Sequence, residues 1–151
     1  MCRNIRLNVP KKKETPEEIA KQILKFLNGL KSIDEVEFSE WFEQGGSKKE
    51  AQSNKVPFEE EYLINNVNKN WDTKFPELGT RVSFWNGKDN DTCSSLVSFN
   101  LGKFTKNPNL SANVRIEIPI EVNAPTLNEK KVKEIVTLMQ DIWGKYPYDI
   151  F

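Results

Sequence analysis

The residues that carry most enzyme chemistry are missing from this chain, and its carboxylates do not form a recognisable site. The 151 residues include no histidine, the commonest general base and metal ligand. Histidine-dependent triads and the usual zinc sites are therefore excluded. Paired carboxylates can hydrolyse glycosidic bonds, but no pair among the 22 Asp and Glu side chains is singled out by its context. We therefore predict that the protein is not an enzyme, with no catalytic residue, no metal ligand and no cofactor.

Two weaker patterns of potential ligands also have structural explanations. The run Lys88-Asp89-Asn90-Asp91 resembles half of a calcium loop, but it lacks the glycine of the sharp turn and the distal glutamate, so a hairpin turn is favoured. Cys2 and Cys93 are too few for a disulfide framework, and we expect both thiols to be free, as in a reducing compartment.

The chain shows no sign of export or of membrane insertion. No apolar run approaches the ~20 residues that span a bilayer. The first six residues, Met1 to Arg6, lack the apolar core and the small-residue cleavage site of a secretory signal. We expect a cytoplasmic protein without a membrane partner.

Charge is unevenly distributed although the net charge is zero. Residues 1–31 carry eight Lys and Arg against three Asp and Glu, whereas residues 34–61 carry nine Asp and Glu against three Lys. The acidic middle segment disfavours direct binding of nucleic acid and suits a basic protein partner, although a solvated helical face explains each single residue as well. The run Lys11-Lys12-Lys13 is too short to predict a nucleic-acid site.

The elements that must position these residues begin with a sheet. Residues 81–85, 97–101 and 114–118 alternate apolar and polar side chains, and residues 5–9 do so at the N-terminus. Period-two alternation predicts antiparallel strands with one buried face. Asn86-Gly87 ends the first of the three central strands because both residues tolerate positive φ.

Helices are predicted between and after these strands. Thr15 caps a helix in which Pro16 is the first residue and Glu18 completes a capping box. Apolar spacing predicts further helices near residues 32–42, 58–67 and 126–143, and the run Ser47-Lys48-Lys49-Glu50 opens a short one. The aromatic tail, residues 146–151, is expected to pack back on the core, because an exposed apolar patch needs a partner.

The expected fold is therefore α+β, with one domain over residues 1–151. An antiparallel sheet of about four strands, the N-terminal strand plus three from residues 81–118, is covered by N-terminal, middle and C-terminal helices. Phe38, Trp41 and Phe42 lie three and four positions apart. Core packing is the favoured role for them, and an exposed aromatic anchor for a partner is the alternative.

Three segments resemble the immunity protein 52 family of bacterial polymorphic toxin systems. The first runs from Ile33-Asp34 to Trp41-Phe42 and on through Gly46-Ser47 and Glu50-Ala51, the second from Gly79 to Gly87, and the third from Asn113 to Pro119. Their order and spacing cover most of the chain. The second glycine of Gly45-Gly46 and the loop at residues 88–92 depart from the family pattern.

The resemblance implies a non-catalytic antidote that binds and blocks a cognate protein toxin, plausibly a nuclease. A nuclease presents a basic cleft, so acidic residues are expected to carry the electrostatic part of the interface, with Trp41 or a neighbouring aromatic as anchor. The expected partner-binding residues are Glu35, Glu37, Glu40, Trp41, Glu43, Glu59, Glu60 and Glu61. Trp85, Asn86 and Gly87 are expected to be structural motif residues.

Two other classes of function stay open at this point. A general protein–protein adaptor unrelated to toxins would use the same fold and the same charge distribution. A small carboxylate hydrolase would need two facing carboxylates in a pocket on the sheet. The protein is expected to be a monomer or a weak dimer.

Overall fold

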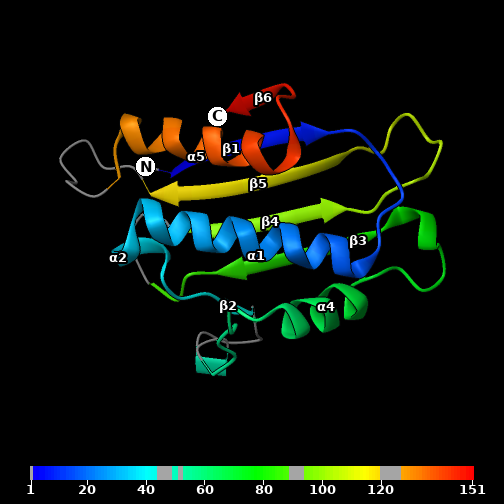
Figure 1. The fold of residues 1–151 in the computed structure, drawn as a ribbon, viewed down its shortest axis with the longest axis horizontal. Helices are drawn as coiled ribbons and strands as arrows, with labels where there is room; N and C mark the ends of the chain where they lie inside the picture. Colours follow the sequence, from blue (N-terminus) through cyan, green and yellow to red (C-terminus); the bar gives the residue numbers. More distant parts are fainter. Residues whose placement is uncertain (1, 44–48, 51–52, 89–93, 120–126) are drawn as a thin grey trace.

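A computed structural model describes residues 2–43, 49–50, 53–88, 94–119 and 127–151. The strands and helices of Figure 1 follow the chain in the order β1, α1, α2, β2, α4, η1, β3, β4, β5, α5 and β6. The hairpin turn predicted at residues 88–91, beyond Lys88, and most of the short helix opened by Ser47 lie outside the described residues. The fold class is α+β, as predicted.

The six strands form one antiparallel sheet in the order β2-β3-β4-β5-β1-β6. Four of them correspond to the alternating runs of the sequence. They are β1 (Cys2–Val9), β3 (Thr80–Trp85), β4 (Leu96–Leu101) and β5 (Ala112–Pro119). The two edge strands are short additions, β2 (Phe42–Glu43) and β6 (Tyr148–Ile150).

The helices cover one face of this sheet. Figure 1 shows α1 (Pro16–Ile33) and α5 (Glu129–Trp143) side by side over the strands, with α2 (Glu35–Phe38) at one end. Helix α4 (Glu60–Lys69) packs against α1 and against β3. The short 3-10 helix η1 (Pro76–Leu78) leads into β3.

Capping residues fix where the two long helices begin. Thr15 Oγ1 accepts a hydrogen bond from the Glu18 amide at 3.1 Å, with Pro16 as the first helical residue, as the sequence predicts. The Asn128 side chain accepts from the Lys131 amide at 3.1 Å and caps α5.

The core lies between the helices and the inner face of the sheet. Its aromatic centre is the contact of Phe26 from α1 with Phe99 from β4, whose ring centroids are 5.8 Å apart in an edge-to-face geometry. Trp143 of α5 packs on both rings at 5.4 and 6.1 Å. Such pairs add about 0.5–1.5 kcal/mol beyond the apolar area that they bury.

Two expectations about the chain ends are wrong. The C-terminal aromatic tail does not pack into the core but pairs with β1 as an edge strand, and its exposed side chains are Tyr146, Tyr148, Ile150 and Phe151. The register places Asp149 beside Arg6, and the two form an ion pair of 3.0 Å.

Cys2 is disulfide-bonded rather than free, and Cys93 lies outside the described residues. Among the described residues, no helix is long and apolar enough to cross a membrane.

Candidate functional site

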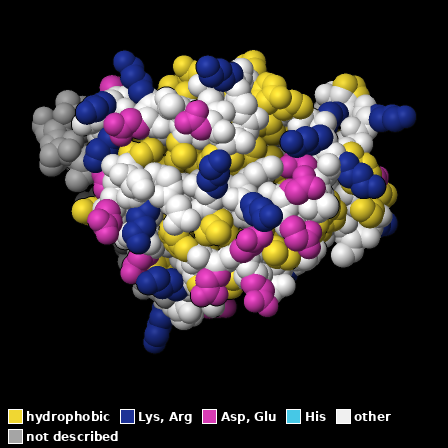
Figure 2. All heavy atoms as spheres, viewed as in Figure 1, with side chains coloured by type: hydrophobic (Ala, Val, Ile, Leu, Met, Phe, Trp, Pro, Cys, Tyr) yellow, Lys and Arg dark blue, Asp and Glu magenta, His cyan; other side chains and the backbone are white. Residues whose placement is uncertain are grey.

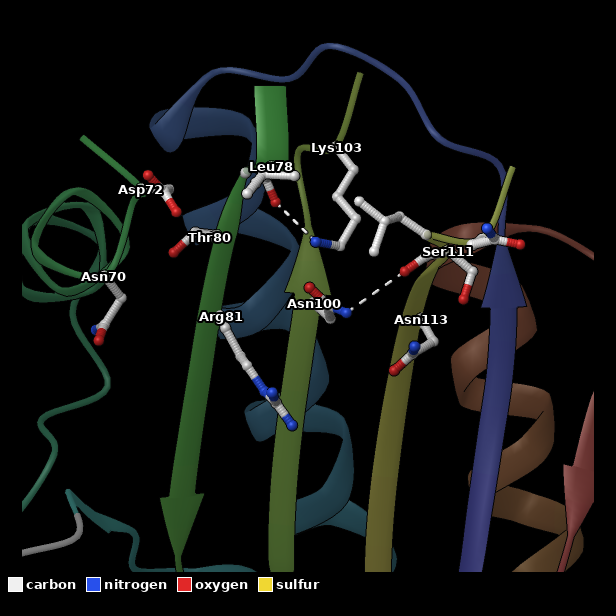
Figure 3. Close-up of a pocket in the computed structure, with 12 residues that line it drawn as sticks. Asn70, Asp72, Leu78, Thr80, Arg81, Asn100, Lys103, Ser111 and Asn113 are labelled. Carbon is white, nitrogen blue, oxygen red and sulfur yellow. Dashed lines mark hydrogen bonds between the residues drawn. The ribbon is translucent and has the colours of Figure 1, made fainter. Parts of the chain in front are cut away.

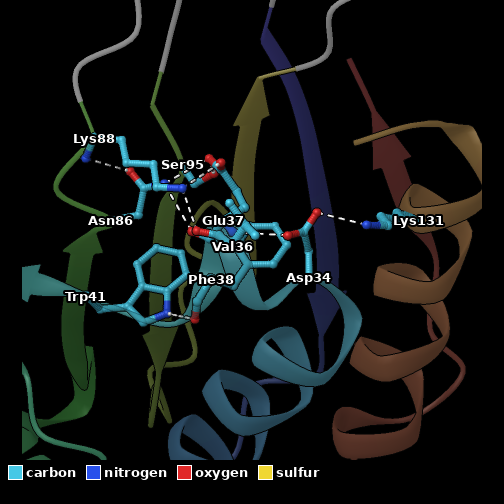
Figure 4. A network of polar contacts seen from close by, with 9 residues as sticks. All are labelled: Asp34, Val36, Glu37, Phe38, Trp41, Asn86, Lys88, Ser95 and Lys131. Atoms are coloured by element: carbon cyan, nitrogen blue, oxygen red, sulfur yellow. Dashed lines mark hydrogen bonds and ion pairs between the residues drawn. The ribbon is translucent and has the colours of Figure 1, made fainter. Parts of the chain in front are cut away.

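Asp34, which belongs to the first of the three segments that resemble the immunity protein family, connects α1, α2 and α5. Asp34 ends α1 and caps α2, because one of its carboxylate oxygens accepts from the Glu37 amide at 3.0 Å. The other oxygen lies 2.8 Å from Nζ of Lys131 in α5. Asp34 is buried, so this carboxylate fixes the position of α2 and is not available to a partner (Figure 4).

Glu37 lies inside the same polar network. Its Oε1 accepts 2.8 Å hydrogen bonds from Asn86 Nδ2 and from Ser95 Oγ, and its Oε2 lies 3.5 Å from Nζ of Lys88. The residue is 8% exposed. The prediction that Glu37 contacts a partner is therefore corrected: this side chain is occupied by internal hydrogen bonds that join α2 to the end of β3 (Figure 4).

Trp41 lies in the core, the role that the sequence favours for it, and not in the predicted interface. It is fully buried, its ring stacks on Phe38 with centroids 6.0 Å apart, and its Nε1 donates to the Phe38 carbonyl at 3.1 Å. Neither ring is accessible, so neither is an anchor for a partner. Phe42 is half-buried and packs against Trp85, with centroids 6.4 Å apart.

The second resembled segment ends at a turn beside these aromatics. Trp85 Nε1 donates to Ser94 Oγ at 2.7 Å on the uncovered face of the sheet. Asn86 is buried, and Gly87 adopts a φ of 78° directly against the ring of Phe42. The first and second resembled segments therefore meet in space, because β2 pairs with β3 and Asn86 bonds to Glu37.

Glu43 holds β2 to α4 instead of projecting into solvent. It accepts hydrogen bonds from Tyr62 at 2.7 Å, from Lys69 at 2.9 Å and from Asn66. Burial opposes the charged form of Glu43, but these donors and the charge of Lys69 together lower the pKa of its carboxyl group. Burial, reinforced by the carboxylate, raises the pKa of the Tyr62 hydroxyl. These contacts join β2 to α4, and a partner contact by the half-buried Glu43 stays a prediction.

Internal ion pairs reduce the charge that the acidic segment presents to solvent. Asp34, Glu37 and Glu43 pair with lysines from outside residues 34–61, and Glu40 pairs with Lys55 at 3.1 Å while both stay exposed. Figure 2 shows Lys and Arg side chains interspersed with Asp and Glu over the helix-covered face. Of the predicted residues, Glu35, Glu40, Glu59 and Glu61 are exposed, whereas Glu43 and Glu60 are half-buried.

A groove of about 330 Å³ lies where α2 approaches the turn after β3. Val36 lines it and is 69% exposed, more than any other large hydrophobic side chain among the described residues. Phe42 and Lys88 also line it, and Lys88 Nζ donates to the Val36 carbonyl. Sequence reasoning missed Val36 because a single valine in an acidic run has no periodicity, whereas the aromatics around it do.

The described residues include no cluster of three or more His, Cys, Asp or Glu side chains that could hold a metal ion. Comparisons with models of known protein families and with curated proteins find no match for the chain. The arrangement of the described side chains and the resemblance of three segments to the immunity protein 52 family are therefore what a function can be proposed from.

Proposed function

We propose that this protein is a non-catalytic immunity protein that binds a cognate bacterial toxin, plausibly a nuclease, and covers its active or substrate-binding surface. The observation that carries the proposal is the groove beside α2, in which Val36 is 69% exposed and is followed four positions later by the exposed Glu40. The groove lies where two of the three resembled segments meet.

The chemistry of this groove suits a basic protein partner. Burying an exposed aliphatic side chain such as Val36 contributes about 1.5–3 kcal/mol. Glu35 and Glu40 flank it in the sequence, and both are exposed. Carboxylates at the rim of an interface accelerate encounter with a basic surface, while a desolvated apolar contact slows dissociation.

A second group of carboxylates extends the acidic surface. Glu59, Glu60 and Glu61 lie at the beginning of α4, and their side chains have no hydrogen bond or ion pair to any described residue. Negative charge at a helix N-terminus is stabilised by the helix dipole, so this cluster also has a structural explanation. We call the set Glu35, Val36, Glu40, Glu59, Glu60 and Glu61 the revised acidic surface.

The proposal includes a place of action in the cytoplasm. There, reducing systems keep most thiols free, whereas Cys2 is disulfide-bonded in the structure. A thiol count on protein isolated from bacterial cytoplasm, with alkylation at lysis, tests this part separately from toxin binding.

The test of the function is growth rescue. The gene next to the one that encodes this chain is expressed from an inducible promoter in a bacterial host, with and without this protein. We expect the neighbouring product to arrest growth and this protein to restore it through a direct complex. Arrest without rescue, or a complex formed only with a non-toxic partner, overturns the proposal, and the second result favours the adaptor.

Variants locate the interface once rescue is seen. Glu35→Lys combined with Glu40→Lys is expected to lower the association rate and its salt dependence, and Val36→Ser is expected to raise the dissociation rate. Glu134→Lys is the matched control, because Glu134 is an exposed carboxylate of α5 outside the revised acidic surface. Equal binding by the wild type and all three variants would remove this surface from the proposal.

A further inference from the structure

A second concave site lies on the face of the sheet that the helices leave uncovered. It is a pocket of about 480 Å³ between the beginning of β3, the end of β4, the beginning of β5 and the C-terminal end of α4. Figure 3 shows Lys103, Asn100, Asn113 and Arg81 around it, with the helices behind the strands. The α2 groove shares no lining residue with this pocket.

Lys103 places a buried positive charge in the wall of this pocket. The residue is 9% exposed, and its Nζ donates to the Leu78 carbonyl at 2.8 Å. No described acidic side chain forms an ion pair with it. Burial and the charge of Arg81 lower the pKa of the Lys103 ammonium, with Asp72 acting in the opposite direction. A buried cation with unused donors favours an anion nearby.

Arg81 adds a second cation to the pocket. It is exposed on β3, and its guanidinium makes no hydrogen bond or ion pair to a described residue. The one acidic residue in the lining is Asp72, and its Oδ1 already accepts from the amides of Lys74 and Phe75 at 3.0 and 2.7 Å. The pocket therefore carries net positive charge.

Two asparagines supply neutral hydrogen-bonding groups between these cations. Asn100 of β4 is paired with Asn113 of β5 in the sheet register, and Arg81 is the neighbour of Asn100 on the other side. Asn100 Nδ2 reaches the Ser111 carbonyl at 3.4 Å, a long hydrogen bond that a better acceptor can replace. The Asn113 side chain has no hydrogen bond to a described residue.

We propose that this pocket binds a small ligand through an oxyanion group, a phosphate monoester or a carboxylate. Arg81 offers the planar fork of donors that matches either oxyanion, and Lys103 supplies a point charge. The side-chain amides of Asn100 and Asn113 hydrogen-bond the other oxyanion oxygens of the ligand or its neighbouring hydroxyl groups. The pocket is separate from the proposed toxin-binding surface. Glu60 of the revised acidic surface and Asn70 of the pocket lie about 15 Å apart along α4 at ~1.5 Å per residue, so this proposal does not depend on toxin binding.

The test is calorimetric titration of the full chain with three probes: inorganic phosphate, glycerol 3-phosphate and N-acetylglutamate. Binding is measured for the wild type, Arg81→Gln, Lys103→Met and Arg115→Gln. Arg115 is the matched control because it is an arginine on the same uncovered face, on β5, that does not line the pocket.

We expect saturable binding of at least one probe, weakened about tenfold or more in Arg81→Gln and Lys103→Met through loss of a charge-assisted hydrogen bond. Arg115→Gln should bind within about twofold of the wild type. Preference for the phosphates or for the carboxylate identifies the oxyanion. Absence of saturable binding, or equal weakening in Arg115→Gln, overturns the proposal. Because Arg81 is exposed, its variant stays informative even if Lys103→Met does not fold.

Discussion

Asn86 Nδ2 donates a 2.8 Å hydrogen bond to Oε1 of Glu37, a residue 49 positions earlier in the chain. The same amide nitrogen reaches the Glu37 carbonyl at 3.2 Å. Both residues are buried. The side chain of Asn86, which directly follows β3, therefore donates to both the backbone carbonyl and the carboxylate of Glu37 in α2. This contact is one of the links between the helix that carries Val36 and the sheet, beside those of Ser95 and Lys88.

Replacement of Asn86 should therefore loosen α2. Asn86→Ala leaves the Glu37 carboxylate with one donor fewer in a buried setting, and we expect a loss of about 1–3 kcal/mol in the free energy of unfolding. Urea denaturation measures the loss. Asn68→Ala, an exposed asparagine in α4, is the control and should change the stability by less than about 0.5 kcal/mol. Equal effects of the two variants would contradict the assigned role of Asn86.

The pH dependence of stability should depend on Glu43. The pKa of its carboxyl group is lowered in the folded protein below the value of 4.5 for an unperturbed group. The folded state therefore binds fewer protons than the unfolded chain, so the stabilisation is complete above pH 4.5 and is lost as the pH falls through the folded pKa.

Glu43→Gln removes this linkage and should flatten the stability profile below pH 4.5. At neutral pH we expect a loss of about 1 kcal/mol, because a charged acceptor is replaced by a neutral one. Thermal unfolding is followed from roughly pH 3 to pH 7, a range that brackets the ordinary pKa of a glutamate. It gives both the slope of the stability profile and the loss of stability at neutral pH. Glu61→Gln, at an exposed position of α4, is the control, and a profile for Glu43→Gln that matches the wild type would be inconsistent with the linkage.

Gly87 is expected to resist any side chain for two separate reasons. Its φ of 78° is unfavourable for other residues, and a Cβ there would lie 2.5 Å from Cε2 of Phe42. Gly87→Ala should cost about 2 kcal/mol in stability.

A double-mutant cycle separates these two causes. In the background of Phe42→Leu the ring is absent, so the steric part of the Gly87→Ala cost should disappear while the backbone part, about 1 kcal/mol, remains. Chemical denaturation of the four proteins gives the coupling energy. An unchanged cost in the Phe42→Leu background would show that the ring contact contributes nothing.

The central strands were predictable from the sequence because their side chains alternate strictly. Val97, Phe99 and Leu101 all face the core, as period two requires. The edge strands β2 and β6 contain two and three residues, too few for a periodic signal. The exposed aromatic tail was missed because exposure follows from its position at the sheet edge and not from its composition.

The interface was harder to predict, because the burial of a charged side chain depends on distant partners. Glu37 lies in an acidic run whose composition predicts a solvent-exposed face. Its carboxylate nevertheless accepts a hydrogen bond from Ser95, 58 positions away in the chain. No local pattern indicates that contact. Local sequence does not settle the exposure of Val36 or of Trp41 either: α2 has four residues and turns its valine outward, whereas the ring of Trp41, which was named as a possible anchor, is buried.

The burial of Trp41 and the exposure of Val36 lead to a prediction that separates stability from binding. Trp41→Phe keeps an aromatic ring in the core but removes the indole donor to the Phe38 carbonyl and leaves a cavity. The expected loss is about 2 kcal/mol in stability, with rescue of toxin-producing cells unchanged wherever the variant stays folded. Val36→Ser should do the opposite, because an exposed side chain contributes little to stability but is available to the proposed partner. Urea denaturation and growth rescue are measured for both variants. If a folded Trp41→Phe lost rescue while Val36→Ser kept it in full, Trp41 and not Val36 would be the residue that anchors the partner.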